Sequence, residues 1–144
     1  EEGKGMGANL VSQFVWTVMQ KKEIIIYGDG SQKRDFTYVK DVAQAIILGL
    51  WSEKQFLGEI FNVASGQSYS LNELVKYINL VLGTAVVPTY IKNPIKNYIV
   101  SQDADISKIK TALGYVPEYS LSKGLSELIP MIRLNLIKCS FEEK

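Results

Sequence analysis

The sequence predicts an α/β fold, and two observations carry this prediction. Stretches with apolar residues at three- and four-residue spacing, typical of one helix face, alternate with short runs of β-branched and aromatic residues, which favour strands. No repeat or low-complexity tract interrupts the alternation. The 144 residues are 47% hydrophobic and 22% charged, which suits one globular unit with its own core. We therefore expect a single α/β unit over residues 1–144.

The first third of the chain is predicted to hold two helices and a buried strand. Apolar residues at helical spacing predict a helix over 8–19 that starts near Asn9. The continuous apolar run 24–27 has the pattern of a strand buried on both faces, and the glycine-rich segment 28–31 ends it as a loop. After a short extended piece over 35–39, Asp41 is the expected N-cap of a helix over 42–51.

The middle of the chain carries the clearest helix signal. A strand is predicted over 59–63, followed by a turn at 64–66. Ser70 and Glu73 have the spacing of a capping box, and they open an apolar helical stripe over 71–82 that Gly83 closes. We expect this helix to start and end as the sequence indicates.

The last third is predicted to contain short extended pieces and two helices. A strand over 86–91 belongs at a sheet edge because Pro88 lacks an amide donor, and 98–100 is a second extended piece. Asp105 is the expected cap of a helix over 106–113, and Ser120 starts a final helix that Pro130 should kink or split. Three or four short strands make a thin sheet with open edges, so we expect the chain to complete its layers against a larger partner.

Composition excludes several classes of function. The net charge of +1 is too small to attract nucleic acid or an anionic membrane electrostatically, so we expect neither as a partner. The chain has no histidine, which excludes Ser-His-Asp catalysis and imidazole metal sites within it, and we expect no metal. Cys139 is the single cysteine, which suits a reducing, cytoplasmic location. No apolar run approaches the length of a membrane-spanning helix.

The residues from Tyr27 to Asp35 are the candidate functional site. A strand that ends in glycines lets the backbone approach a ligand at the carboxyl end of a sheet, and we include Gly28 for this reason. Arg34 follows within the same segment and can bind a diphosphate through paired hydrogen bonds. The alternatives are an ordinary turn and an Arg34 that pairs with Asp35 or Asp41 on the surface. Asn9 is likewise either a plain helix cap or part of an anion site at a helix N-terminus.

Three motifs give the chain a resemblance to a known family. Residues 27–43 (YGDGSQKRDFTYVKDVA), 61–74 (FNVASGQSYSLNEL) and 104–115 (ADISKIKTALGY) are similar to signature segments of the nucleotide-sugar epimerases and dehydratases, the extended short-chain dehydrogenase/reductases. The resemblance covers most of the chain from residue 7 to about residue 130. It implies the carboxyl-terminal, sugar-nucleotide-binding part of such an enzyme, with a small mixed sheet and several helices.

The resemblance also implies which residues bind the substrate. Asn9 and the amide of Leu10 match the helix start that receives the diphosphate. The backbone of Ile25 and Tyr27 matches the strand that contacts the base, and Arg34 matches the diphosphate-binding arginine. Asn62 is expected to fix local backbone.

Two further positions point to one branch of the family. The "RxGD" stretch of many 4-epimerases is absent, because the corresponding segment 94–98 has no arginine and no acid. Tyr98 instead matches a substrate-contacting tyrosine of the ADP-glycero-manno-heptose 6-epimerases, whose "EGxKG" loop resembles residues 2–5. In that branch the loop lysine is a catalytic base, so Lys4 is a candidate for that role, against a solvated or phosphate-facing lysine. The run 27–36 fits UDP-sugar 4-epimerases equally well.

The family's catalytic motifs are missing from this chain. Members bind NAD or NADP through a "GxxGxxG" turn, and a "YxxxK" tyrosine removes the sugar proton while the cofactor accepts the hydride. Only Tyr119 and Lys123 have the latter spacing, in a segment that aligns elsewhere. We therefore expect the cofactor to be held mainly by an upstream part, the isolated chain to be inactive, and the longer enzyme to form a homodimer.

From the sequence we expect the substrate-binding part of a UDP-glucose/UDP-galactose 4-epimerase. The ADP-heptose 6-epimerase, a nucleotide-sugar dehydratase or decarboxylase, and a non-catalytic sugar-nucleotide-binding module stay open as alternatives.

Overall fold

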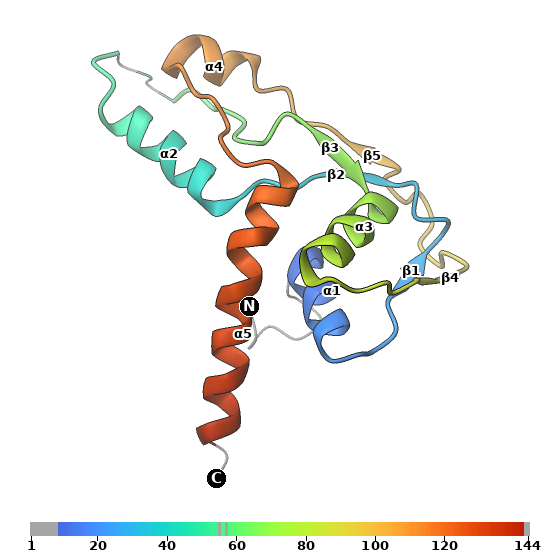
Figure 1. The fold of residues 1–144 in the computed structure, drawn as a ribbon. Coiled ribbons are helices and arrows are strands. Elements are labelled where there is room, and N and C mark those ends of the chain that lie inside the picture. Colours follow the sequence, from blue (N-terminus) through green and yellow to red (C-terminus); the bar gives the residue numbers. More distant parts are fainter. Residues whose placement is uncertain (1–8, 55, 57, 143–144) are drawn as a thin grey trace.

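Helices form most of the regular structure in the computed structural model, which describes residues 9–54, 56 and 58–142 (Figure 1). The helices of this part of the chain are α1 (Leu10–Met19), α2 (Val39–Leu50), α3 (Leu71–Leu82), α4 (Ser107–Leu113) and α5 (Leu121–Glu142). None of them is long and apolar enough to cross a membrane. The predicted α/β class is confirmed.

Five short strands in the described residues form two separate small sheets. They are β1 (Ile25–Tyr27), β2 (Lys33–Asp35), β3 (Ser68–Ser70), β4 (Thr89–Ile91) and β5 (Ser101–Gln102). In the first sheet β1 runs parallel to β4, with Ile26 opposite Tyr90. In the second the order is β3-β2-β5, and Arg34 on the central strand lies opposite Tyr69 on one side and Gln102 on the other. The sequence predicts one thin, mixed sheet, whereas the structure has two thin sheets, of which the second is mixed and the first is a parallel pair.

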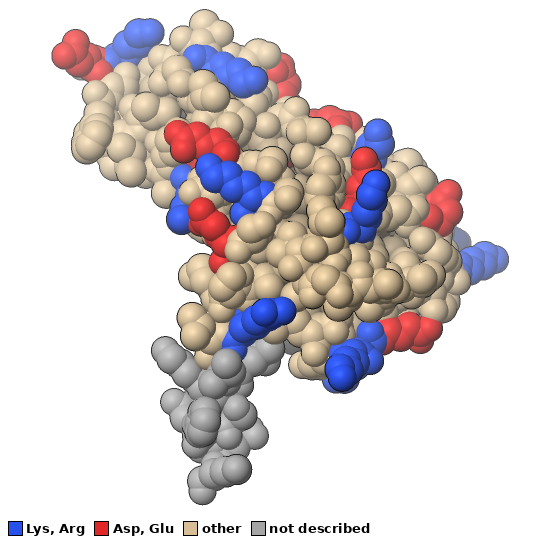
Figure 2. Space-filling model, in the orientation of Figure 1, with Lys and Arg blue, Asp and Glu red and all other residues tan. Residues whose placement is uncertain are grey.

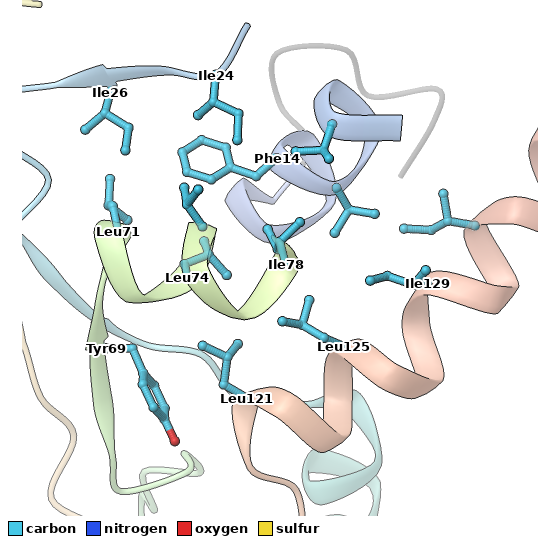
Figure 3. Close-up of a cluster of buried hydrophobic side chains, with 14 residues drawn as sticks. Phe14, Ile24, Ile26, Tyr69, Leu71, Leu74, Ile78, Leu121, Leu125 and Ile129 are labelled. Carbon is cyan, nitrogen blue, oxygen red and sulfur yellow. The ribbon is translucent and has the colours of Figure 1, made fainter. Parts of the chain in front are cut away.

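The main core lies between α1, α3, α5 and the inner face of β1 (Figure 3). The apolar stripe of α3 faces it, so Leu74 and Ile78 have no exposed surface, and Leu125 of α5 packs on them at 1% exposure. Apolar burial at helical spacing is the main stabilising term for helices of this length. This core fixes the position of β1, whose Ile24 and Ile26 point into it.

A second, smaller core joins α2 and α4 at one end of the fold, away from α1 and α3 (Figure 1). Its centre is Tyr115, which is fully buried and donates its hydroxyl proton to the carbonyl of Ala64 at 2.9 Å. Only Asp41 and Ala45 of α2 are buried. The outer face of this helix is apolar and exposed, at 76% for Leu50, and the following Trp51 is 83% exposed.

The predicted start of α1 and both predicted ends of α3 are confirmed. The Asn9 side chain caps α1 by accepting a hydrogen bond from the Ser12 amide at 2.9 Å. Ser70 and Glu73 form the reciprocal capping box of α3, and Gly83 ends that helix with φ of 67°, a conformation that favours glycine. These ends are set by neighbours in the sequence, so local patterns suffice to find them.

The strand over 24–27 is buried on one face only, so the prediction of two buried faces is wrong. Ile24 and Ile26 are 1% exposed, whereas Ile25 and Tyr27 are 50% and 47% exposed. The described residues cover only the inner face of this two-stranded sheet. The side chains of β1 therefore alternate between core and surface.

Asp41 is not the N-cap of α2, because the helix begins at Val39 with Tyr38 at the cap position. The Asp41 carboxylate is 1% exposed and accepts hydrogen bonds from the amides of Glu118 at 2.8 Å and Tyr119 at 3.3 Å. A buried carboxylate needs donors, and these come from a segment about 80 positions away. No local pattern indicates them.

No strand forms over 59–63, and a strand that the sequence analysis missed forms at 68–70 instead. No described segment pairs with 59–63 through a ladder of backbone hydrogen bonds. The carbonyl of Ile60 instead accepts a hydrogen bond from Lys108 Nζ at 2.9 Å. Asn62 does not fix local backbone as expected but ties this segment to a distant one, since its side-chain amide donates to the Asp105 carbonyl at 3.3 Å. Strand formation at 68–70 depends on β2, which is distant in sequence.

The remaining differences concern element ends. The strand over 86–91 is confined to 89–91, and the extended piece at 98–100 is followed by pairing at 101–102. Asp105 accepts a hydrogen bond from the Ser107 amide at 2.8 Å, but the residue at the N-cap position of α4 is Ile106. Helix α5 runs through Pro130 without the predicted split.

Candidate functional site

The loop between β1 and β2 is a rigid turn built on two glycines. Gly28 and Gly30 have φ of +86° and +77°, which L side chains rarely adopt. Gln32 is buried, and its Nε2 donates to the carbonyl of Tyr27 at 2.7 Å, which closes the loop on itself. The Asp29 carboxylate accepts hydrogen bonds from the amide and hydroxyl of Ser31, which lowers its pKa. The loop is therefore stabilised by its own side chains.

The N-terminus of α3 holds this loop in place through hydrogen bonds. The amides of Leu71 and Asn72 each donate at 3.2 Å, to the carbonyls of Gln32 and Gly30 respectively. Asn72 Nδ2 also donates to the Asp29 carbonyl at 3.0 Å. The first amides of a helix lack partners within the helix, so here the loop satisfies them. The sequence analysis used Asn72 only as part of a family motif and missed this contact.

The outer edge of β1 presents unpaired backbone groups. The even-numbered residues bond to β4: the Thr89 amide donates to the Ile24 carbonyl, and the Gly28 amide donates to the Ile91 carbonyl, both at 2.8 Å. Residues along a strand alternate in the edge to which their N–H and C=O point. The N–H and C=O of Ile25 and the N–H of Tyr27 therefore face the other edge, where no described strand lies.

Arg34 lies on β2 beside Tyr98. Its Nη1 donates to the Lys33 carbonyl at 2.6 Å and its Nη2 to the Ile99 carbonyl at 2.8 Å. The guanidinium carbon is 5.2 Å from the centre of the Tyr98 ring, within range of a cation–π contact. These contacts use two of the five N–H groups of the guanidinium, and the others have no partner among the described residues.

The surface ion pairs considered for Arg34 do not form. The Asp35 carboxylate accepts hydrogen bonds from the amides of Ser65 at 3.0 Å and Gly66 at 2.8 Å, and so holds the turn at 64–66. Asp41 is occupied by the two amides described above. Arg34 is therefore free of carboxylate partners among the described residues.

A pocket of about 500 Å³ opens beside the start of α1. Asn9 and Leu10 line it together with residues 35–39 and the first turns of α5. Asn9 caps α1 through Ser12, and no hydrogen bond is recorded for the amide of Leu10 within the described residues. Arg34 does not line this pocket, whose wall begins with the next residue, Asp35.

The predicted site residues thus fall into three groups. Arg34 and Tyr98 are in contact, Ile25, Tyr27 and Gly28 lie along β1 and its exit, and Asn9 and Leu10 line the pocket. The Gly28 amide is already bonded to Ile91, so Gly28 can offer a ligand only its Cα and carbonyl. Lys4 lies outside the described residues.

The rim of the pocket carries a charged cluster that the sequence analysis did not single out. Glu127 Oε2 accepts hydrogen bonds from Lys40 Nζ at 2.5 Å and from the Tyr38 hydroxyl at 3.4 Å. The Lys40 ammonium lowers the pKa of Glu127, and the carboxylate in turn raises the pKa of Lys40. Burial and the Glu127 charge raise the pKa of Tyr38. On the face drawn in Figure 2, basic and acidic residues are interspersed and gather into no single-sign patch.

The described residues fit neither a dinucleotide nor a metal ion. The glycine loop leads into strand β2 and not into a helix, and the Asn72 side chain fills the space above Gly30, with Oδ1 only 2.1 Å from where a Cβ would lie. A pyrophosphate cradle needs an open loop at a helix N-terminus. No group of three acidic, cysteine or histidine residues in the described part is arranged to hold a metal.

Comparisons with known proteins agree with the architecture. The sequence profile of the GDP-mannose 4,6 dehydratase family matches residues 2–128. Among solved structures, the Thermotoga maritima UDP-glucose 4-epimerase, crystallised with UDP-glucose, is 32% identical, with a TM-score of 0.80 over 90% of this chain and 41% of that one. The Helicobacter pylori ADP-L-glycero-D-manno-heptose-6-epimerase is 32% identical, with a TM-score of 0.75 over 88% of this chain and 37% of that one.

A third neighbour contains the cofactor. The Bacillus cereus UDP-glucuronic acid 4-epimerase, in complex with UDP-glucuronic acid and NAD, is 28% identical, with a TM-score of 0.77 over 86% of this chain and 40% of that one. The chain thus spans about two fifths of the length of these neighbours. With a family profile matched over most of its residues, the chain belongs to the GDP-mannose 4,6 dehydratase family of nucleotide-sugar epimerases and dehydratases, within the extended short-chain dehydrogenase/reductases.

Proposed function

We propose that this chain is the substrate-binding part of an NAD(P)-dependent nucleotide-sugar epimerase of the UDP-glucose/UDP-galactose 4-epimerase type, and that it corresponds to the carboxyl-terminal part of such an enzyme. The observation that carries the proposal is Arg34, whose guanidinium has no carboxylate partner among the described residues and lies against Tyr98 next to the hydrogen-bonded glycine loop. Its charge is available for an anionic ligand.

The edge of β1 suits a nucleobase. The carbonyl of Ile25 and the amide of Tyr27 point to the same side as neighbouring acceptor and donor. This pair complements the imide N–H and adjacent carbonyl of uracil, and equally the amino N–H and adjacent ring nitrogen of adenine. We assign base binding to this edge.

The diphosphate then belongs to Arg34 and to the start of α1. A charged hydrogen bond from a guanidinium is worth about 1.5–3 kcal/mol. The Leu10 amide, at the positive end of the α1 dipole, adds a second donor, and Asn9 holds that turn in place. The sugar extends from the diphosphate beyond this chain, which contributes binding and orientation and not bond chemistry.

We assign the dinucleotide to the rest of the enzyme, since Asn72 occupies the space above Gly30 in the loop between β1 and β2. We therefore expect no epimerisation by these 144 residues alone.

A second candidate is an ADP-heptose 6-epimerase. The contact between Tyr98 and Arg34 favours it, because it brings the tyrosine that resembles this branch to the proposed diphosphate site. Lys4 is its candidate catalytic base. The two candidates differ in the base, which makes them separable by binding.

Isothermal titration calorimetry on the chain with UDP-glucose, UDP-galactose and an ADP-linked sugar tests the proposal. The first candidate requires UDP-sugars to bind more tightly than the ADP-sugar, and we expect Arg34→Ala to weaken binding roughly 10- to 100-fold. Arg133→Ala, which removes an exposed arginine of α5, is the matched control and should bind like the wild type. Preference for the ADP-sugar would favour the second candidate. Absence of binding to all three ligands would refute both, and unchanged affinity in Arg34→Ala would refute the role of Arg34.

A further inference from the structure

One side chain, Asn72, holds the loop that connects the two parts of the proposed nucleotide site. Its Nδ2 donates to the Asp29 carbonyl at 3.0 Å, and its Oδ1 accepts a hydrogen bond from the Tyr90 hydroxyl at 2.9 Å. Its backbone amide donates to the Gly30 carbonyl at 3.2 Å. Asp29 and Gly30 belong to the loop between β1 and β2, and Tyr90 belongs to β4. Asn72 therefore ties this loop, the first sheet and α3 together.

The spacing between the base-binding edge and Arg34 depends on this tie. Strands β1 and β2 lie in different sheets, so no ladder of hydrogen bonds fixes one relative to the other. Residues 28–32 are the direct chain connection between them. The loop is held at Gly30, which has no side chain to keep Asn72 away and which Asn72 contacts closely.

We propose that Asn72 is a positioning residue that sets the distance between the strand edge that binds the base and the guanidinium that binds the diphosphate. This inference rests on the proposed function and deepens it. A nucleoside diphosphate must reach both ends of the site at once, so it gains affinity only when the two ends are correctly spaced. Inorganic pyrophosphate contacts only the Arg34 end and does not depend on the spacing.

Two substitutions release the loop in different ways. Asn72→Asp keeps the size of the side chain and the acceptor for Tyr90 but removes the donor to Asp29. An acid in the first turn of a helix also suits the helix dipole, which favours a folded variant. Asn72→Ala removes both contacts without adding charge, and it separates the loss of positioning from electrostatic repulsion of the ligand.

Asn79 provides a matched control on the same helix. Its Nδ2 donates to the Val86 carbonyl at 2.8 Å and its Oδ1 accepts from the Val86 amide at 3.0 Å, at the end of α3 away from the loop. Asn79→Asp and Asn79→Ala remove comparable hydrogen bonds there. They therefore show what loss of stability alone does to binding.

Calorimetric titration of the chain with UDP and with inorganic pyrophosphate measures the effect, with thermal unfolding followed by circular dichroism as a check of the fold. We expect Asn72→Ala to bind UDP about tenfold more weakly and pyrophosphate within about twofold of the wild type, and Asn72→Asp to lose more affinity for UDP than for pyrophosphate. Tyr90→Phe, which removes one contact of Asn72, should weaken UDP binding in the same direction by less. The Asn79 variants should bind both ligands like the wild type.

The outcomes separate the inference from the function on which it rests. A wild-type chain that binds neither UDP nor pyrophosphate overturns both. The positioning role alone is overturned if the wild-type chain binds UDP but the Asn72 variants bind it with unchanged affinity. It is also overturned if these variants lose affinity for UDP and for pyrophosphate equally.

Discussion

Replacing Gly30 by alanine tests how tightly the loop and α3 are joined. Gly30 has φ of +77°, and a Cβ built there would lie 2.1 Å from Asn72 Oδ1 and 2.7 Å from its Cγ. Real Cβ atoms do not approach other atoms so closely, so the Asn72 side chain must move. Its hydrogen bonds to Asp29 and Tyr90 are then lost.

The cost has two separable parts. Placing alanine in a left-handed conformation costs about 1–2 kcal/mol, and losing two hydrogen bonds costs about 0.5–1.5 kcal/mol each. We therefore expect Gly30→Ala to lower the free energy of unfolding by about 2–5 kcal/mol. Gly83 has a similar φ of +67° with no atom within 4 Å of its Cβ position. Gly83→Ala should cost only the conformational part, about 1–2 kcal/mol.

Urea unfolding of both variants, followed by circular dichroism, measures these free energies. The double variant Gly30→Ala/Asn72→Ala removes the clash, so the two substitutions should be non-additive by about 1–3 kcal/mol. Equal losses at positions 30 and 83, or additive effects in the double variant, would refute the close packing of Asn72 on Gly30.

Two other predictions concern the second core. Asp41→Ala leaves the amides of Glu118 and Tyr119 without their acceptor and should lower the free energy of unfolding by about 2–4 kcal/mol. Asp41→Asn keeps one acceptor oxygen and should lower it by less. Equal stability of Asp41→Ala and the wild type in urea unfolding would contradict this prediction. Burial, with the nearby charges of Asp41 and Asp35, raises the pKa of Tyr115 to about 12. The folded state then holds the hydroxyl proton of Tyr115 more tightly than the unfolded state does. The contribution of Tyr115 to the free energy of unfolding is therefore complete below pH 10 and is lost as the pH rises toward 12. Tyr115→Phe should lower the free energy of unfolding by about 1 kcal/mol at neutral pH, because the hydrogen bond to the Ala64 carbonyl is lost. It should also make the loss of stability between pH 10 and 12 less steep. An unchanged pH dependence of stability in this range would contradict the raised pKa of Tyr115.

Elements defined by nearby residues could be predicted, and elements defined by distant ones could not. Helix α3 carries its start at Ser70 and Glu73 and its end at Gly83, so the sequence pattern is enough. Strand β3 exists because Tyr69 lies opposite Arg34. The segment 59–63 has strand-like composition but no described neighbour with which to pair. Composition alone cannot distinguish the two cases.

The candidate site divides in the same way. Arg34 stands out in the sequence because a guanidinium after a glycine turn suits a diphosphate, and the family motif strengthens this interpretation. Asn72 gave no such signal, because an asparagine in the first turn of a helix is ordinary. Its contacts with Asp29, Gly30 and Tyr90 arise only when α3 folds against the loop.

The sequence by itself determined the α/β class, the family, the start of α1 and the limits of α3, because residue types and spacings a few positions apart encode them. Tertiary structure decided which amides the carboxylates of Asp35 and Asp41 accept from, which edge of β1 has no described partner and which side chain ties the glycine loop to the first sheet and α3. These depend on pairs such as Asp41 with Glu118 and Asn72 with Asp29, which lie 77 and 43 positions apart. Contacts at that separation follow from how the cores assemble, and no local pattern contains them.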